Sequence, residues 1–315
     1  MGLEVAVVCD RDRARAERRR DEFYPGAAVT TEWREVVRRD DVAVVDAALH
    51  PEPRVEVVAE ALRAKKHVLS QKPFALDLAD GERLAALAAE HGVRLAVNQN
   101  GRWAPHFSWM AAAVRAGVIG EVASVDFSLQ WDHTWTAGTP FEEIRHLVLF
   151  DFGIHWFDIA TQLLPGWRAE RVTASVARAS FQTMKPPLLA QVAMDGAGAQ
   201  VRMSFNGHLR HGQRDTTVIC GSRGTLRSEG PSLSEQRVWL ETAAGRAEVP
   251  LEGTWFTSGF QGTMGELLAA VAEEREPSNG AASVLPGLAN CFAAMASADA
   301  GGAPTVPGTV RRAPT

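Results

Sequence analysis

Lysine, cysteine and tyrosine are scarce in this chain. Its 315 residues include three cysteines, one tyrosine and four lysines, although lysine and arginine together number 33. The three cysteines, Cys9, Cys220 and Cys291, lie far apart without a Cys-x-x-Cys pair, which predicts neither a disulfide framework nor a zinc site. Because arginine supplies most of the positive charge, a remaining lysine such as Lys72 is more often present for its own chemistry.

The chain also lacks the signatures of membrane and nucleic-acid proteins. Its net charge of −5 excludes a broad basic surface for nucleic acid. No uninterrupted apolar run approaches the ~18–20 residues that cross a bilayer, and the N-terminus does not look like a signal peptide. We therefore expect a cytoplasmic protein that binds neither nucleic acid nor membrane, and the spacing of its residues favours no metal site.

Strand-like and helix-like segments alternate over the first hundred residues. Continuous apolar stretches predict buried strands over residues 3–9, 42–48, 67–70 and 94–97, separated by helices over 11–23, 53–65 and 78–91. A further helix is expected over 105–116. Such alternation is typical of a parallel sheet covered by helices, which predicts an α/β domain over residues 1–118.

The pattern changes after Gly120. Apolar and polar residues alternate strictly over 124–131, the signature of an antiparallel sheet with one polar face. More such strands are expected over 171–177, 189–194, 200–206, 216–220, 238–241 and 247–251, with an Asp195-Gly196 turn. Helices are expected over 147–164, 259–275 and 284–298. We therefore predict an α+β domain over 119–304 that includes the C-terminal helices, followed by a tail over 305–315.

One helical segment combines ionisable and large apolar residues. Asp151, His155 and Asp158 are spaced i, i+4 and i+7, which places them on one stripe of an ideal helix surrounded by Phe and Trp. Ionisable groups on a buried helix are costly unless they are paired or face a polar cavity. A histidine beside a carboxylate is suited to proton transfer, and a structural Asp–His–Asp network is the alternative.

Two further candidates follow expected parallel strands. Gln71 and Lys72 come after the strand over 67–70, at the sheet edge where ligands bind in open α/β sheets. Asp10 ends the first strand, where an acidic residue can hydrogen-bond an adenosine ribose, and the adjacent Arg11 could meet a ribose 2′-phosphate. A helix cap or turn is the alternative for Asp10, and a solvated turn is the alternative for Lys72.

Taken in order, several segments resemble the Gfo/Idh/MocA oxidoreductase family. VAVVCDRDRARAE is similar to the family's second Rossmann strand and helix, ALRAKKHVLSQKPFAL to its Glu-Lys-Pro segment, and VNQNGRWAPHF to the strand and turn that follow. DFGIHWFD is similar to its Asp-x-Gly-x-His-x-x-Asp helix, and CGSRGTLR to its late Gly-Thr turn. The resemblance extends from Leu3 to about Pro304.

The resemblance implies a Rossmann-like NAD(P)-binding domain and a sheet domain that carries the substrate and often forms homo-oligomers. It implies hydride transfer between NAD or NADP and a carbinol carbon of a sugar, cyclitol or other polyol. Lys72, His155 and Asp151 match catalytic positions, and Asp10, Arg11, Gln71 and Lys72 would contact the cofactor. Weaker candidates for the substrate cavity are Arg102, Trp103, His133, Trp135, His146, Asp158 and His208.

Two features depart from the family pattern. Gln71 replaces the acidic residue before the lysine, and the first strand with its Gly-x-Gly-x-x-Gly turn is absent, so the Rossmann-like domain is N-terminally shortened. A start inside a longer coding sequence predicts that strand and turn upstream of Met1. Two alternatives are a shortened member that acts as a binding or partner subunit, and a metal-dependent lyase or hydrolase using Asp151 and His155.

Overall fold

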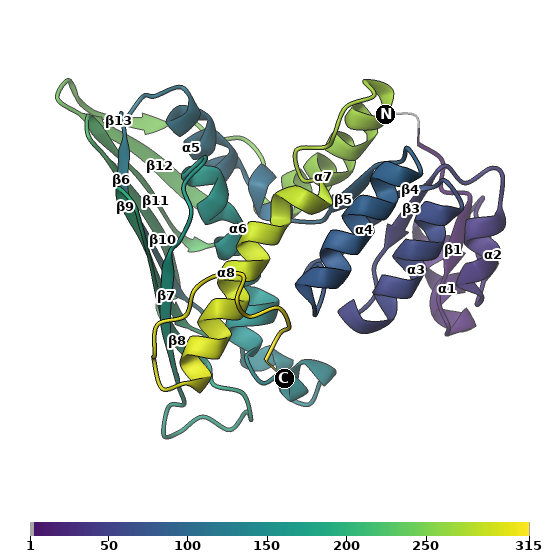
Figure 1. Ribbon diagram of the computed structural model, residues 1–315, viewed down its shortest axis with the longest axis horizontal. Coiled ribbons are helices and arrows are strands. Elements are labelled where there is room, and N and C mark those ends of the chain that lie inside the picture. The colour runs from purple at the N-terminus through teal and green to yellow at the C-terminus, as the bar shows by residue number, and fades with distance from the viewer. Residues whose placement is uncertain (1–2, 315) are drawn as a thin grey trace.

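The computed structural model describes residues 3–314 and begins with alternating parallel strands and helices (Figure 1). This order confirms the predicted α/β organisation of the first part of the chain. The elements are β1 (Val7–Cys9), α1 (Arg13–Phe23), β2 (Ala28–Thr30), α2 (Trp33–Arg38), β3 (Val44–Ala47), α3 (Pro51–Arg63), β4 (His67–Ser70), α4 (Leu78–Glu90) and β5 (Leu95–Val97). The sequence patterns did not predict β2 or α2.

The parallel strands form two separate sheets rather than one. Among the described strands β1 pairs only with β2, whereas β3, β4 and β5 form a second sheet in that order. The expectation of a buried strand over residues 3–9 was wrong: β1 spans three residues, and Leu3, Val5 and Cys9 are exposed. Within residues 3–314 no strand pairs with the second edge of β1, so that edge has no neighbour to bury it.

The second part of the chain is a large, mostly antiparallel sheet. Eight strands follow the order β13-β12-β11-β10-β6-β9-β8-β7, and only the central pair β6 and β9 is parallel. The predicted alternation holds in β6, where Val125, Phe127 and Leu129 are buried. The bounds are β6 (Val122–Gln130), β7 (Arg171–Ala177), β8 (Leu189–Gly196), β9 (Ala199–Asn206), β10 (Arg214–Gly221), β11 (Gly224–Ser232), β12 (Glu235–Thr242) and β13 (Gly245–Val249).

Two details of this sheet correct the sequence prediction. Asp195 and Gly196 are the last residues of β8, and the turn to β9 is made by Ala197 and Gly198 instead. Gly198 has a φ of +78°, a left-handed conformation that glycine adopts without steric cost. The strand β11 was missed because its sequence, GTLRSEGPS, lacks a clear alternation of apolar and polar residues.

Helices cover one face of the large sheet and connect it to the parallel strands. They are α5 (Pro105–Arg115), α6 (Ile154–Leu163), α7 (Trp255–Ala272) and α8 (Ala281–Asp299). α7 contacts β4 and β5 of the first part, while α8 contacts α4 and β5 of the first part and β7 of the large sheet. Figure 1 shows the opposite face of the sheet without a covering helix. The domain boundary at residue 118 stays a prediction.

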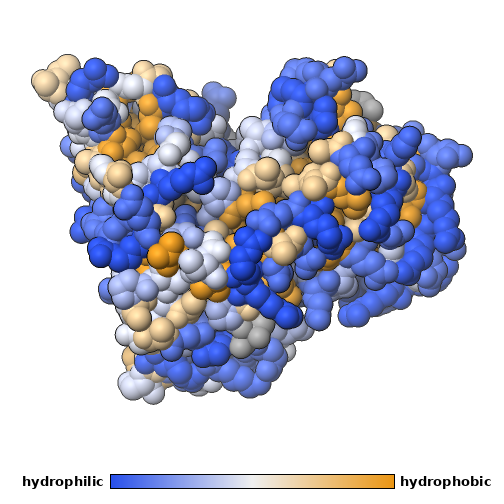
Figure 2. Space-filling view, in the orientation of Figure 1, coloured by the Kyte–Doolittle hydropathy of each residue, from blue (hydrophilic) through white to orange (hydrophobic). Residues whose placement is uncertain are grey.

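The segment after α8 packs back onto the molecule. Thr305 pairs with Val172 of β7, and the Ala313 N–H donates to the Leu76 carbonyl. The 19 residues of α8 are long and apolar enough to cross a membrane by length and composition, although Ser283, Pro286 and Asn290 interrupt the apolar run. The helix is largely buried, as core helices also are. Figure 2 shows hydrophobic residues gathered around α8 and hydrophilic ones over α1, α2 and α3.

Candidate active site

The loop after β4 brings Lys72 against Asp151. Lys72 Nζ donates to the main-chain carbonyl of Asp151 at 2.6 Å and lies 3.1 Å from its carboxylate Oδ1. Both side chains are 20% exposed, so the pair is partly shielded from water but still accessible. Two residues that are 79 positions apart in the sequence thus form a charged pair at the carboxyl end of a parallel strand.

Main-chain contacts of the neighbouring residues hold the start of this loop. The Gln71 N–H donates to the Ala47 carbonyl, which continues the pairing of β4 with β3. The Gln71 side chain turns back, and its Oε1 accepts the Lys72 N–H at 2.8 Å. The glutamine therefore orients the main chain of Lys72 without placing a negative charge beside its ammonium group.

The helix that carries Asp151 is interrupted. A five-residue π-turn, Val148–Phe152, precedes α6, and Gly153 joins the two. The expected single stripe of Asp151, His155 and Asp158 is therefore wrong: the two carboxylates have different partners, Lys72 for Asp151 and Arg102 for Asp158. A π-turn contains one residue more than an α-turn, so it rotates the preceding side chains out of α-helical register.

His155 lies near the Lys72–Asp151 pair in an aromatic environment. Its ring centroid is 5.8 Å from that of Trp255 and 6.4 Å from that of Trp156, both nearly perpendicular to it. Burial and the Lys72 charge hold the pKa of His155 well below its usual range. The imidazole is therefore neutral at neutral pH. Its buried Nδ1 has no hydrogen-bond partner, and Asp151 does not hydrogen-bond to it.

Of the weaker candidates, His133 also belongs to this group. Burial lowers its pKa to about 4, Asp151 raises it and Lys72 lowers it, so its ring lies within electrostatic reach of both charges. The ring also packs against Phe152 and the exposed Trp135, with centroids 4.4 and 5.3 Å away. Lys72, Asp151, His155 and His133 therefore form one cluster, referred to below as the Lys72 cluster.

Other candidates from the sequence have structural partners elsewhere. Arg102 and Asp158 form a buried two-pronged ion pair, with Nε–Oδ2 at 2.7 Å and Nη2–Oδ1 at 2.6 Å. His146 Nε2 lies 3.0 Å from Oδ1 of Asp299 in α8. Two candidates pack against neighbouring elements: Trp103 lies beside Gly262 of α7, and the His208 ring lies 5.1 Å from that of Phe181.

Sequence patterns do not point to Trp255, which begins α7 and lies against the His155 ring. The helix was expected to start at residue 259. Trp255 Nε1 donates to the Asn100 side chain at 3.2 Å, which fixes the indole between the two parts of the chain. Trp255 lies in a glycine-containing segment, with Gly253 before it and Gly259 after it. These glycines do not indicate that the tryptophan would reach the Lys72 cluster.

On the cofactor side, Asp10 and Arg11 follow β1 as expected. Asp10 Oδ1 accepts the Asp12 N–H at 2.9 Å, the contact of a turn, while Oδ2 lies 3.5 Å from Arg15. Arg11 is exposed. Within residues 3–314, none of the loops at the carboxyl ends of β1 to β4 is a glycine-rich turn that could present backbone amides to a pyrophosphate.

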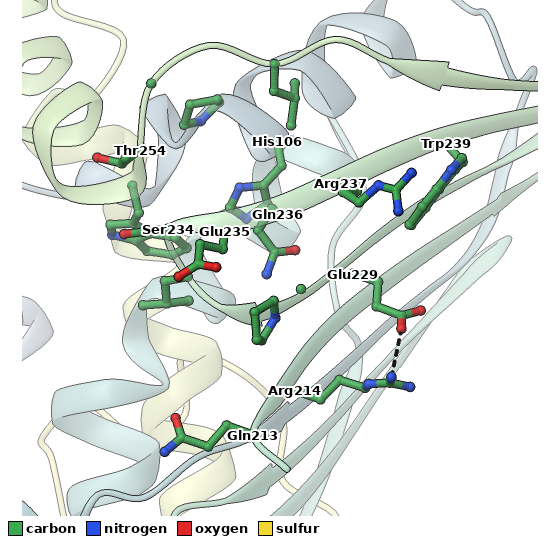
Figure 3. A pocket seen from close by; sticks show the side chains of 17 residues that line it. His106, Gln213, Arg214, Glu229, Ser234, Glu235, Gln236, Arg237, Trp239 and Thr254 are labelled. Carbon is green, nitrogen blue, oxygen red and sulfur yellow. Dashed lines mark ion pairs between the residues drawn. The ribbon is translucent and has the colours of Figure 1, made fainter.

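A cavity of about 530 Å³ lies apart from the Lys72 cluster (Figure 3). It is formed by the start of α5, the hairpin of β11 and β12, and the segment before α7, and contains the Arg214–Glu229 ion pair. Trp255 lines this cavity, and its ring also lies against that of His155. Among the described residues, no group of three or more metal-ligating side chains could hold an ion.

Comparison with protein families gives two consecutive matches. Residues 1–99 match GFO_IDH_MocA, described as an oxidoreductase family with an NAD-binding Rossmann fold. Residues 107–227 match the GFO/IDH/MocA C-terminal domain. The second match includes the π-turn and α6, and the first includes Lys72.

Curated relatives match over different lengths. The chain is 30% identical to D-apiose dehydrogenase of Paraburkholderia graminis over 165 residues, 50% of this chain and 42% of that protein. It is 27% identical to the myo-inositol dehydrogenase Hyg17 of Streptomyces leeuwenhoekii over 91% of this chain and 94% of that one. For D-apiose dehydrogenase and two uncharacterized Schizosaccharomyces pombe oxidoreductases, the match spans less than half of the relative's length.

Solved structures share the fold across almost the whole chain. An Agrobacterium radiobacter oxidoreductase in complex with NAD⁺, L-tartaric acid and magnesium has a TM-score of 0.86 and 22% identity, covering 96% of this chain and 91% of that one. An aldose-aldose oxidoreductase of Caulobacter crescentus, complexed with glycerol, has a TM-score of 0.81 and 19% identity at the same coverage. Both parts of the fold therefore occur together in other oxidoreductases.

Proposed function

Because this chain belongs to the Gfo/Idh/MocA family of oxidoreductases with an NAD-binding Rossmann fold, we propose that it transfers hydride between NAD(P) and a carbinol carbon of a sugar, cyclitol or other polyol. The Lys72 cluster carries this proposal. It places an ammonium group, a carboxylate and a neutral imidazole together at the carboxyl end of β4. These are the groups needed to bind a hydroxyl and accept its proton.

The residues of this chain fit the nicotinamide and adenosine ends of a dinucleotide better than the pyrophosphate between them. Gln71 and Lys72 are at the strand end where the nicotinamide would lie. Oδ2 of Asp10 lies 3.5 Å from Nη1 of Arg15, which leaves it able to accept from an adenosine ribose. For the pyrophosphate, residues 3–314 provide no glycine-rich cradle. When bound, the cofactor would supply the nicotinamide that accepts hydride.

The chain's own residues would control the hydroxyl proton. Lys72 Nζ, held by two oxygens of Asp151, has a third N–H for the substrate oxygen and stabilises negative charge that develops there. The neutral imidazole of His155 accepts the proton. Asp151 balances the Lys72 charge and can accept from a second substrate hydroxyl, which favours a polyol over a simple alcohol.

Binding and turnover of substituted chains test this proposal. In Lys72→Ala and His155→Ala we expect NAD(P)H binding by calorimetry to persist within threefold, while turnover of a polyol falls by about 10²-fold or more. Lys185→Ala is the matched control, because Lys185 is an exposed lysine paired with Glu143 and should leave turnover unchanged. Unchanged turnover in both site variants would contradict the assigned roles.

The two separate parallel sheets favour a second candidate, a binding or partner subunit without turnover. β1 and β3 belong to different sheets, and the described chain has no glycine-rich turn at their ends. Such a subunit would fold but would not quench or shift NAD(P)H fluorescence. Titration of this chain, beside one preceded by its upstream coding residues, separates the candidates: binding by the longer chain alone assigns the cofactor site to an additional strand and turn.

A further inference from the structure

The first turn of α3 contains a fully buried arginine. Arg54 is 1% exposed, and its guanidinium donates from Nη1 to the Leu49 carbonyl at 2.5 Å. Nη2 donates to the Pro73 carbonyl and approaches the Phe74 carbonyl at 3.4 Å. Its Nε is buried without a partner. All contacts of this cation within the described chain are thus to main-chain oxygens.

This placement of Arg54 is costly in three ways. Burial of a charged group is unfavourable unless it is paired, and within the described chain the Arg54 guanidinium donates to main-chain carbonyls rather than to a carboxylate. A cation in the first turn of a helix also opposes the helix dipole, and one of its N–H groups is unsatisfied. Burial lowers the pKa of Arg54 to about 10, so the group is still protonated at neutral pH.

The carbonyls bound by Arg54 come from two loops at the same edge of the sheet. Leu49 follows β3, and Pro73 directly follows Lys72 at the end of β4. On the other side of Lys72, its N–H is held by Gln71 Oε1. The main chain around Lys72 is therefore held on both sides, by the glutamine before it and by the arginine behind it.

We propose that Arg54 is a positioning residue that aims Lys72 at Asp151 by binding the carbonyls of Pro73 and Phe74. Arg54 is too buried to touch a substrate and acts only through the loop. Its importance for turnover rests on the proposed function, but its effect on Lys72 does not. A shift of about 1 Å in a reacting group can lower the rate by two orders of magnitude. A rigid loop around Lys72 can therefore offset the unfavourable burial of the Arg54 charge.

Lysine-selective NMR tests the positioning directly, because the chain has only four lysines. With ¹³C-labelled lysine, the Cε signal of Lys72 is assigned from its loss in Lys72→Arg, and Asp151→Asn shows how far it moves when its partner is removed. In Arg54→Met we expect the signal to move by at least half that amount. The signals of Lys65, Lys66 and Lys185 should stay in place.

A second variant separates position from charge. Arg54→Lys keeps the positive charge but replaces the two guanidinium nitrogens that bind the Leu49 and Pro73 carbonyls with a single nitrogen, so the Lys72 signal should still move. It also keeps the test decisive if Arg54→Met does not fold. Ser297→Ala, which removes a buried hydrogen bond to the Ala174 N–H in β7, is the control for general destabilisation and should leave the Lys72 signal unchanged.

Turnover provides the second readout. If the proposed function holds, both Arg54 variants should lose at least tenfold in kcat per folded molecule, with NAD(P)H affinity within threefold of the parent chain. A Lys72 signal that stays in place in a folded Arg54→Lys chain would overturn the positioning role, whether or not the chain turns over. Absence of turnover in the parent chain, with a moved Lys72 signal, would contradict the proposed function alone.

Discussion

Lys72 and His155 influence each other's ionisation. The imidazole is kept neutral first by burial and second by the ammonium group of Lys72. A neutral imidazole can accept a proton, but the resulting imidazolium is unfavourable next to Lys72 unless negative charge develops on the substrate oxygen between them. At the scale of single residues, we therefore expect His155 to accept a proton only as negative charge develops on the substrate oxygen.

The pH titration of His155 tests this dependence. The group's pKa is lowered in the folded chain, so in the parent protein it should become protonated only well below pH 6.5. Lys72→Met removes the second cause of the shift, and the pKa should rise but stay below 6.5 because burial remains. Histidine-selective NMR measures both values. A pKa that falls in the variant, or a parent value at or above 6.5, would be inconsistent with this environment.

At the scale of elements, the π-turn before α6 sets where the Asp151 side chain points. The Gly153 N–H donates to the Val148 carbonyl at 2.7 Å, five residues earlier. This bond completes the wide turn and directs Asp151 towards Lys72, while α6 carries His155 and Asp158 in ordinary helical register. The glycine is required for space, because a Cβ at this position would lie 2.8 Å from the carbonyl oxygens of Val148 and Leu149.

Gly153→Ala should therefore destabilise the chain and disturb the pair at once. We expect a loss of about 1–3 kcal/mol in the free energy of unfolding, the usual cost of overpacking, together with a moved Lys72 signal. Denaturant unfolding measures the first effect and lysine-selective NMR the second. Gly26→Ala is the matched control, since a Cβ added at this position would meet no atom within 4 Å. Equal stability of the two variants would rule out this account of the turn.

At the scale of the whole molecule, the uncovered face of the large sheet is the main surface without a described partner. A row of small polar side chains crosses its centre, with Gln191 beside Ser204, Ser204 beside Ser128 and Ser128 beside Thr216. An ion pair between Arg202 and Asp126 lies on the same face. Because this face has no covering helix, we propose that copies of the chain associate through it, the homo-oligomer that the family resemblance implies.

Sedimentation tests that assembly. We expect the chain to form a dimer or a larger closed oligomer, and Ser204→Arg, which places a long charged group at the centre of the face, to shift it towards monomer. Thr257→Arg adds the same charge to the exposed surface of α7 and should leave the assembly intact. A parent chain that sediments as a monomer at all concentrations would refute an interface through the sheet.

The separate parallel sheets show the limit of local patterns at this scale. The apolar run over residues 3–9 predicted a strand buried on both faces, but burial depends on the elements packed around a strand. The edge strand β5 is fully buried although β4 is its only partner strand within the described chain, whereas Leu3, Val5 and Cys9 of the run are exposed. Local sequence indicates the tendency to form a strand, whereas the elements packed around it decide whether it is buried.

The amino-acid sequence by itself determined the alternation of strands and helices in the first part, the change from a parallel to a mostly antiparallel sheet, and the family to which the chain belongs. These depend on periodicity and short motifs, which are local. Only the tertiary structure decided which of the candidate residues meet. Lys72 and Asp151 are 79 positions apart, and the ionic partner of Asp158 is Arg102 rather than the nearby histidine. Such pairings depend on how the loops after β4 and before α6 pack, and on the width of one helical turn.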